Sequence, residues 1–322
     1  MTSKQTQALL NWYEISGRDL PFRHKGGAHP DPYTVWISEM MLQQTTIATV
    51  IPYLERFKKR FPDIETLAKA SEEDVLFYWQ GLGYYSRARN VLKCAKEIMA
   101  TYGGVFPKER EKLIKLPGIG PYSAGAIRTL AFNEPEVVID GNVIRVMTRY
   151  FAMTAEVKSI AKDIEEKARS LISQKHAADY TSALMDLGAT VCTPKSPKCL
   201  ICPWNDGCKA LKENLIDQIP KIEKMKKEKR IGIVSMIEKG GKILFRKSTD
   251  GLFKGMDILP YRYVEKAPKN LPYIKHVFTH FDLTLYIENK KHENEEGFWV
   301  KKSEIKNLST PTLMKKVIKE IN

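Results

Sequence analysis

The stretch Leu116–Asn142, LPGIGPYSAGAIRTLAFNEPEVVIDGN, decides how this chain folds. It opens with a glycine hairpin, PGIG, between two segments of helical pattern. Gly118 and Gly120 allow backbone conformations closed to other residues, and they let a partner approach closely. The helix that follows presents free N–H groups and the positive end of its dipole, which suits a phosphate. Because the chain also carries a net charge of +14, we expect this phosphate to belong to DNA and both glycines to contact it; the alternative is an ordinary tight turn.

The stretch ends at an acidic residue, Asp140, which precedes Gly141 and a helical run. The simplest interpretation is a helix N-cap. A helix N-terminus also stabilises a charged carboxylate, so Asp140 is a candidate for chemistry that needs a fixed negative charge.

The 322 residues are enough for two or three domains, and 43% are hydrophobic, as is usual for soluble proteins. The net charge of +14 predicts a large polyanion as partner, DNA or RNA rather than a membrane; a merely basic protein is the alternative. The N-terminus lacks an apolar signal core, and no apolar run approaches the ~20 residues that span a bilayer. We expect a cytoplasmic, nucleoid-associated protein.

Four of the five cysteines form the pattern C-x6-C-x2-C-x5-C, which indicates a metal site rather than disulfides. The expected ligands are Cys192, Cys199, Cys202 and Cys208. Four thiolates suit either a zinc ion or an iron–sulfur cluster. The loop between the first two ligands carries Lys195 and Lys198, which we expect to contact phosphates.

Residues 1–210 show helical periodicity and no alternating strand pattern, so this part should be nearly all α. Helices are expected at 5–15, 34–53, 64–70, 72–80, 86–102 with Ser86 as N-cap, 108–115, 121–132, 142–151, 158–173 and 178–190.

The pattern changes after residue 215. Residues 219–230 are interpreted as a basic linker, with a charged helix end as the alternative. Beyond them the period is two: RIGIVSMIE and KILFRKS around Gly240-Gly241 predict a β-hairpin, and 281–288 and GFWVKK predict strands. A final helix with Thr310 as N-cap completes a small α+β domain.

These motifs resemble those of a known superfamily. The stretches LPGIGPYSAG and IDGNVIRV and the cysteine spacing resemble the helix–hairpin–helix DNA glycosylases, and WISEMMLQQTTIATVIPYLERF and GLGYYSRARN resemble the adenine DNA glycosylase (MutY) family within it. The resemblance covers residues 8–210 and continues more weakly to the C-terminus. It implies a mainly α glycosylase body at 1–215, with a six-helix part at about 30–135 and an iron–sulfur part at 1–29 plus 136–215. A basic linker (216–230) and a trimmed Nudix-like 8-oxoguanine recognition domain (231–322) follow.

The implied function is base-excision repair. Family members flip out and remove adenine mispaired with 8-oxoguanine or guanine in double-stranded DNA, and they carry one 4Fe–4S cluster. We expect a monomer. Two rivals remain: a glycosylase for thymine in G:T mismatches, and a non-catalytic iron–sulfur DNA-binding protein.

Cleavage of an N-glycosidic bond calls for one protonated and one ionised carboxyl group. Glu39 shares a helical face with Val35, Trp36 and Leu42, so we expect a raised pKa and a role as acid. The resemblance assigns it protonation of adenine. It assigns Asp140 the stabilisation of the cationic sugar, with support from Asn142.

Tyr122 stands where backbone-cutting relatives carry the lysine that forms a Schiff base, so we expect a monofunctional enzyme. The resemblance implies further DNA contacts. Gln44, Leu82 and Tyr84 would wedge into the base stack, Thr45 would approach 8-oxoguanine, Arg18 and Arg23 would lie near the adenine pocket, and Phe278, Thr279 and His280 would read 8-oxoguanine. Leu82 and Tyr84 could equally belong to the core.

The chain departs from the family pattern in several places. Phe22 replaces the usual Trp, Thr181-Ser182 replaces Asn followed by Gln or Glu, and Met256 lies where an aromatic residue is usual. Residues 260–272 are shortened, and the Glu-rich Nudix helix is missing, so we expect no pyrophosphatase activity.

Overall fold

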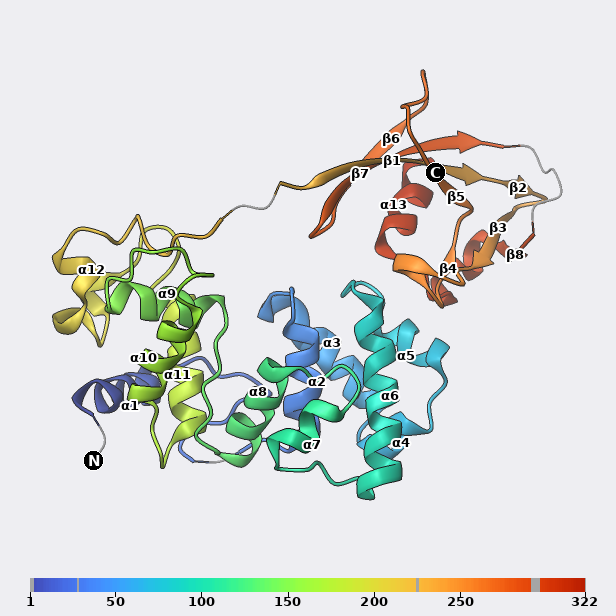
Figure 1. Cartoon of the computed structure of the whole chain (residues 1–322). Coiled ribbons are helices and arrows are strands. Elements are labelled where there is room, and N and C mark those ends of the chain that lie inside the picture. The colour runs from blue at the N-terminus through green and yellow to red at the C-terminus, as the bar shows by residue number, and fades with distance from the viewer. Residues whose placement is uncertain (1–2, 28, 224–225, 291–295, 322) are drawn as a thin grey trace. The chain divides into compact units, whose positions relative to one another are not determined.

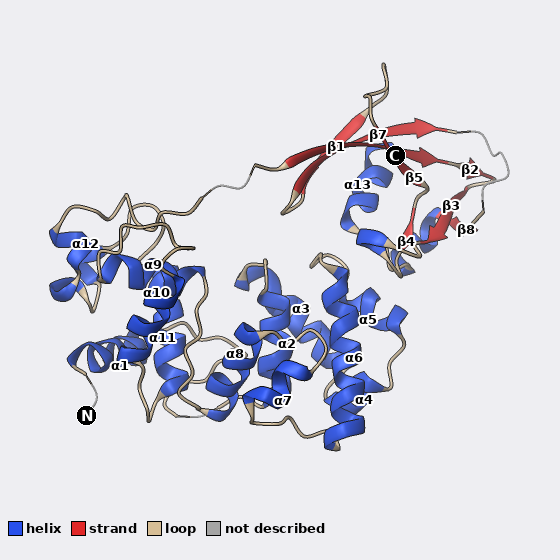
Figure 2. Cartoon of the chain, in the orientation of Figure 1, coloured by secondary structure: helices blue, strands red, loops and turns tan. Residues whose placement is uncertain are grey.

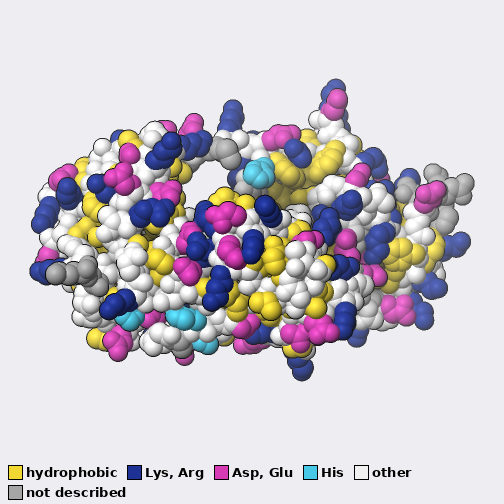
Figure 3. Space-filling model, turned by 60° about the horizontal axis from the view of Figure 1, so that its bottom comes forward, with side chains coloured by type: hydrophobic (Ala, Val, Ile, Leu, Met, Phe, Trp, Pro, Cys, Tyr) yellow, Lys and Arg dark blue, Asp and Glu magenta, His cyan; other side chains and the backbone are white. Residues whose placement is uncertain are grey.

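The computed structural model describes residues 3–27, 29–223, 226–290 and 296–321. The chain forms two compact units: Met1–Leu54 with Glu97–Lys224, and Glu55–Lys96 with Met225–Asn322. None of the described helices is long and apolar enough to cross a membrane. In one view of the surface, Lys and Arg side chains are interspersed with Asp and Glu (Figure 3).

The first unit is built of helices (Figures 1 and 2). They are α1 (Lys4–Ser16), α2 (Pro32–Leu42), α7 (Arg110–Lys115), α8 (Pro121–Phe132), α9 (Gly141–Tyr150), α10 (Ala161–Leu171), α11 (Ala177–Thr190), α12 (Lys209–Lys212) and the 3-10 turns η1 (Cys199–Ile201) and η2 (Asn205–Gly207). Two further helices, α3 (Ile47–Arg60) and α6 (Tyr85–Tyr102), cross the boundary between the units. The prediction of a nearly all-α segment up to residue 210 is confirmed for the described residues.

Helices α2, α8 and α11 form the centre of this unit, because each is apolar or small on nearly all sides. Helix α2 packs against α8, and α11 packs against α1, α8 and α9. Polar side chains on these helices are therefore buried unless a pocket opens to them. This arrangement brings the candidate site residues of α2, α8, α9 and α11 together.

The expected helix over 34–53 is two helices. Helix α2 ends at Leu42, and α3 begins at Ile47. Between them Gln44 has a φ of 63°, a left-handed conformation that is uncommon outside glycine, so helical geometry cannot continue. Ser86 is likewise not an N-cap, because α6 already begins at Tyr85 and the left-handed residue before it is Tyr84, with φ 46°.

The second unit combines helices with two sheets. Its elements are α4 (Ile64–Ala68), α5 (Glu72–Trp79), β1 (Glu228–Met236), β2 (Glu238–Lys239), β3 (Lys242–Lys247), η3 (Gly251–Phe253), β4 (Asp257–Ile258), β5 (Tyr261–Val264), β6 (Tyr273–Val277), β7 (Phe281–Asn289), β8 (Phe298–Lys301), η4 (Lys302–Asn307) and α13 (Thr312–Ile321). Trp79 and the rings of Phe57 and Phe61 form part of its helical core.

The larger sheet has the order β5-β1-β7-β6, in which β1 and β7 run parallel and the other pairs are antiparallel. Along β7 every second residue from Phe281 to Ile287 is buried, as the alternating pattern predicted. The smaller sheet joins β2, β3 and β4, with β8 paired to β3.

The predicted hairpin at Gly240-Gly241 is correct only locally. Both glycines have positive φ (57° and 73°), as a tight two-residue turn requires, and they join β2 to β3. The longer strand β1 does not pair with β3; it lies in the other sheet, between β5 and β7. The alternating pattern specified a strand but not its partner.

Two further expectations need correction. The basic segment 219–230 is not all linker. Ile219 is buried, the backbones of Lys221 and Glu156 form a β-bridge, and β1 already begins at Glu228. Thr310 does not cap the last helix: its hydroxyl is buried and has no hydrogen-bond partner among the described residues.

Candidate active site

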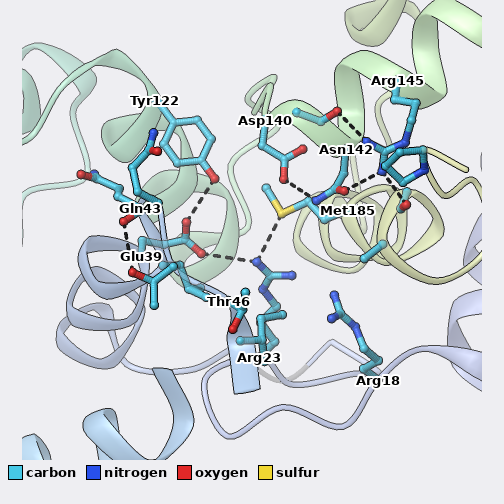
Figure 4. Close-up of a pocket in the computed structure, with 18 residues that line it drawn as sticks. Arg18, Arg23, Glu39, Gln43, Thr46, Tyr122, Asp140, Asn142, Arg145 and Met185 are labelled. Atoms are coloured by element: carbon cyan, nitrogen blue, oxygen red, sulfur yellow. Dashed lines mark hydrogen bonds and ion pairs between the residues drawn. The ribbon is translucent and has the colours of Figure 1, made fainter. Parts of the chain in front are cut away.

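A pocket of about 690 Å³ lies in the first unit and is lined by all four predicted catalytic residues (Figure 4). Its walls come from the loop before α2, the C-terminal end of α2 with the following loop, α8, the start of α9, and α11. The lining includes Arg18, Arg23, Glu39, Gln44, Thr45, Tyr122, Asp140 and Asn142. Segments more than a hundred residues apart in sequence thus share one cavity.

Glu39 lines the pocket from α2, and only 2% of its surface is exposed. The Tyr122 hydroxyl donates a hydrogen bond to its Oε2 at 3.2 Å, and Arg23 Nη2 donates to its Oε1 at 3.4 Å. Burial raises the pKa of Glu39, and the opposing effects of Arg23 and Tyr122 cancel this only in part. The predicted raised pKa is confirmed, with desolvation as its cause.

Tyr122 lies at the start of α8, beside the glycine hairpin. Burial, and then the negative charge of Glu39, raise the pKa of the Tyr122 phenol, so the hydroxyl remains a hydrogen-bond donor. Gly118 has a φ of 78° and is required by the turn. Gly120 has ordinary extended backbone, and a Cβ there would meet nothing, so the free space at Gly120 faces outward and suits an approaching ligand.

Asp140 is the N-cap of α9, as predicted: its Oδ1 accepts the Val143 N–H at 2.7 Å. Asn142 Nδ2 donates to the other oxygen, Oδ2, at 3.0 Å. The negative charge of Asp140 acts on Glu39 and contributes to its raised pKa, after burial. The pocket therefore holds a desolvated carboxyl group and, at a helix N-terminus, a carboxylate fixed by two donors.

Arg145 holds Asn142, the residue that donates to the carboxylate of Asp140. Its Nη2 donates to Asn142 Oδ1 at 2.8 Å and to the Gly188 carbonyl at 2.7 Å, and its Nε donates to the Cys192 carbonyl at 2.7 Å. Gly188 also permits the contact between α11 and α9, because a Cβ there would lie 2.6 Å from the Cβ of Asn142. Arg145 and Gly188 were not predicted; their only signal in the sequence is their position near Asn142 and Cys192.

The two arginines of the loop before α2 meet one buried carboxylate, Asp186 of α11. Arg18 binds it with Nε at 3.0 Å and Nη2 at 2.5 Å, and the Arg18 backbone N–H adds a bond of 2.8 Å. Arg23 Nη1 lies 3.9 Å from the same carboxylate. Asp186 was not predicted either, because its partners lie more than 160 residues away in sequence.

The other predicted DNA contacts are distributed over both units. Gln44 is exposed at the rim of the pocket, and Thr45 lies beside it. Leu82 and Tyr84 belong to the second unit: Leu82 is 5% exposed, in agreement with the core alternative, whereas Tyr84 is half-buried. Lys195 and Lys198 are exposed on their loop.

The four clustered cysteines line one apolar cavity of about 30 Å³, together with Val191, Pro197, Leu211 and Ile216. Among the described residues, no group of three or more His, Cys, Asp or Glu is placed to hold one metal ion. The sulfurs instead surround a space. The buried Arg149 donates to Cys192 Sγ at 3.5 Å and to the Thr193 carbonyl at 2.8 Å, which favours a negatively charged sulfur centre. This donor set fits an iron–sulfur cluster.

The predicted base-reading residues form the turn between β6 and β7. Phe278 stacks on Phe281 at 4.6 Å, and Thr279 and His280 are exposed. Lys227 and the backbone of Glu228 bind carbonyls of the turn, at 2.8 Å and 3.4 Å. The turn is thus fixed at its base and open at its tip.

The single residues that depart from the family pattern, Phe22, Thr181, Ser182 and Met256, are all buried. Ser182 hydrogen-bonds Tyr13, Phe22 is 1% exposed, and Met256 is fully buried. Ser182 is not among the described residues that line the pocket. Ser182 instead faces α1, which packs against α11 and carries Tyr13.

Two family models match the sequence. The HhH-GPD superfamily base excision DNA repair protein matches residues 37–174, and the iron–sulfur binding domain of endonuclease III matches residues 192–208. The second match assigns the cysteines to a 4Fe–4S cluster rather than to zinc, as the resemblance implied.

Curated relatives include two proteins named adenine DNA glycosylase from Buchnera aphidicola. The one from subsp. Baizongia pistaciae is 44% identical over 214 residues, which are 66% of this chain and 60% of that protein. The one from subsp. Acyrthosiphon pisum is 33% identical over 343 aligned positions, which cover 97% of this chain and 96% of that protein. Among solved structures, a thermostable thymine-DNA glycosylase matches with a TM-score of 0.58 and 28% identity, over 65% of this chain and 95% of that one.

Proposed function

Because the chain belongs to the adenine DNA glycosylase family of base-excision repair proteins, we propose that it removes adenine mispaired with 8-oxoguanine or guanine. It would act as a monomer on double-stranded DNA of the nucleoid and leave the backbone uncut. The observation that carries the proposal is the pair of carboxyl groups in one pocket, Glu39 desolvated and Asp140 fixed at a helix N-terminus.

The reaction uses the two carboxyl groups in different protonation states. The adenine is first extruded from the duplex into the pocket. Glu39 gives its proton to a ring nitrogen of the adenine, the glycosidic C–N bond breaks, and its electron pair leaves with the base. The sugar is left as a cation, which the Asp140 carboxylate stabilises or binds transiently. Water then adds to the sugar carbon, and its released proton passes to a carboxylate.

The remaining pocket residues support these two groups. Tyr122 donates to Glu39 at 3.2 Å and would stabilise the carboxylate that forms after proton transfer. Asn142 donates to Asp140 at 3.0 Å and holds it in place. No lysine is among the described residues that line the pocket, which supports a monofunctional enzyme that works without a Schiff base.

Contacts to the rest of the duplex would come from residues of each unit. The free space at Gly120 and the N–H groups at the start of α8 would bind a phosphate, together with Gly118. Gln44 and Tyr84 would enter the base stack, and Arg18, Arg23 and Thr45 would lie along the flipped adenine and the opposite base. Leu82 would reach the stack only if it left its buried position.

The cysteine cavity would hold one 4Fe–4S cluster through Cys192, Cys199, Cys202 and Cys208. When bound, the cluster supplies a structural cross-link. The segment 192–208 would then be rigid and would present Lys195 and Lys198 to DNA phosphates.

The C-terminal sheet unit would be a trimmed Nudix-like domain that reads the base opposite the adenine. What supports this is the fixed turn between β6 and β7, whose Thr279 and His280 are exposed at the tip. Phe278 packs against Phe281 and would hold the turn in shape.

The proposal is tested by single-turnover base release from three duplexes, carrying A:8-oxoguanine, A:G and T:G. We expect release from the first two, no strand cut before alkali, and a loss of about a hundred- to ten-thousandfold in Glu39→Gln. The rival function, thymine removal, would appear as release from T:G alone. A Glu39→Gln protein with unchanged activity would contradict the assignment of the acid, and an efficiently trapped borohydride adduct would contradict monofunctional chemistry.

A further inference from the structure

Asp186 is a buried carboxylate that the proposed reaction does not use. It lies on α11 with 1% of its surface exposed. Arg18 holds it through the backbone N–H and two guanidinium nitrogens, at 2.5 to 3.0 Å. Its Oδ1 also lies 3.9 Å from Nη1 of Arg23, the arginine whose Nη2 is 3.4 Å from Glu39. One buried guanidinium therefore stands between two buried carboxyl groups.

The position of Arg23 matters because a full ion pair would disable the acid. A guanidinium bound in the two-pronged geometry favours the ionised carboxylate and would remove the proton that Glu39 must donate. Arg23 instead reaches Glu39 with one long bond, and its Nε and Nη1 have no hydrogen-bond partner among the described residues. Its geometry is a compromise between the two anions.

We propose that Asp186 is a positioning residue for the proton donor: its negative charge draws Arg23 towards α11 and so leaves Glu39 without a complete counter-ion. This inference rests on the proposed function, in which Glu39 acts as the acid. It gives the two-arginine loop a second purpose beside lining the pocket, because Arg18 sets how much of the Asp186 charge remains for Arg23.

Charged and titratable groups from several elements face the two carboxyl groups. They are Arg23, Tyr122 and Asp140 for Glu39, and Arg18, Arg23 and Tyr13 for Asp186. Arg23 is the group common to both sets. A change at Asp186 should therefore reach Glu39 mainly through Arg23, whereas Tyr122 and Asp140 act on Glu39 from α8 and α9 whatever stands at position 186.

The test is the pH dependence of single-turnover adenine release from an A:8-oxoguanine duplex. The rate falls as the pH rises through the pKa of Glu39, because only the protonated form donates. Asp186→Asn frees Arg23 to pair with Glu39, so this fall should move to lower pH by about one unit. Arg18→Gln leaves the whole Asp186 charge to Arg23, so the fall should move in the opposite direction, to higher pH.

Opposite shifts in the two variants support the inference. A rate that drops equally at every pH in Asp186→Asn, with no displacement of the fall, would mean that Asp186 only anchors the loop to α11, and the inference would be wrong. Thermal melting identifies a variant that does not fold, and Arg18→Gln alone then decides by the direction of its shift. If the wild-type protein releases no adenine from any mispair, the proposed function itself fails and this inference with it.

Discussion

Tyr122 donates a single hydrogen bond to Oε2 of Glu39, the residue proposed as the acid. A hydroxyl that donates to a carboxylate stabilises the ionised form, so Tyr122→Phe should raise the pKa of Glu39 further. The fall in rate should then occur at higher pH. The maximal rate should drop about ten- to a hundredfold, because the carboxylate formed by proton transfer loses a donor worth about 1.5–3 kcal/mol. The measurement is the pH profile of single-turnover release; a profile like that of the wild type would contradict this role.

Leu82 belongs either to the wedge that enters the DNA or to the core of the protein. The family resemblance places it in the DNA base stack, whereas the structure places it in the core with 5% exposure. If the core position holds in the free protein, Leu82→Ala should lower the free energy of unfolding by about 2–5 kcal/mol. Tyr84→Ala, at the half-buried neighbour, should cost less. Urea denaturation of both variants measures the difference, and equal stability of Leu82→Ala and wild type would favour the wedge alone.

The packing of one helix on another positions the proposed catalytic residues. Helices α9 and α11 touch at Gly188 and Asn142, and a Cβ at position 188 would lie 2.6 Å from the Cβ of Asn142. Gly188→Ala should therefore displace the first turn of α9, which carries Asp140 as its cap. We expect a loss of about 10- to 100-fold in single-turnover rate, typical of misplaced catalytic groups.

The matched control for that variant is Gly125→Ala in α8. A Cβ at 125 would find its nearest atoms at 3.7 Å, which is ordinary van der Waals contact, so this protein should retain its rate. If Gly188→Ala kept the wild-type rate while folding normally, the close approach of α9 and α11 would have no part in placing Asp140.

Local features of the elements could be predicted from the sequence. The N-cap at Asp140 follows from its position before a helical run, and the raised pKa of Glu39 follows from its apolar neighbours on the same helix face. Features set by distant partners could not. Asp186 looks like any helical carboxylate until folding brings Arg18 to it, and the pairing of β1 with β7 depends on residues about fifty positions away. The break at Gln44 was missed because apolar residues stand at helical spacing on both sides of the polar segment 43–46.

In the whole molecule, the contacts between residues define other domain boundaries than the sequence motifs do. The sequence suggested a helical body up to residue 215 and a separate sheet domain from 231. The contacts instead group residues 55–96 with the C-terminal part. Within that unit Lys247 Nζ donates to Glu73 Oε1 at 3.0 Å, and Arg89 donates to the Lys254 carbonyl at 2.7 Å. Such polar surface contacts leave no periodic pattern in the sequence, so the motifs could not reveal them.

The function proposed for the whole molecule requires two sites on one duplex, one that cuts the adenine and one that reads its partner base. We propose Thr279 and His280 for the second, because both are exposed at the tip of a turn that is fixed at its base. Thr279→Ala with His280→Ala should slow release from A:8-oxoguanine by about tenfold or more, the effect of one or two lost hydrogen bonds, and leave A:G unchanged. Single-turnover rates on the two duplexes measure this ratio. Ser303→Ala, which removes an exposed hydroxyl elsewhere in the same unit, is the control and should change neither rate. Equal slowing on both duplexes would mean that the turn binds DNA without reading the base, and unchanged rates on both would place the recognition of 8-oxoguanine elsewhere.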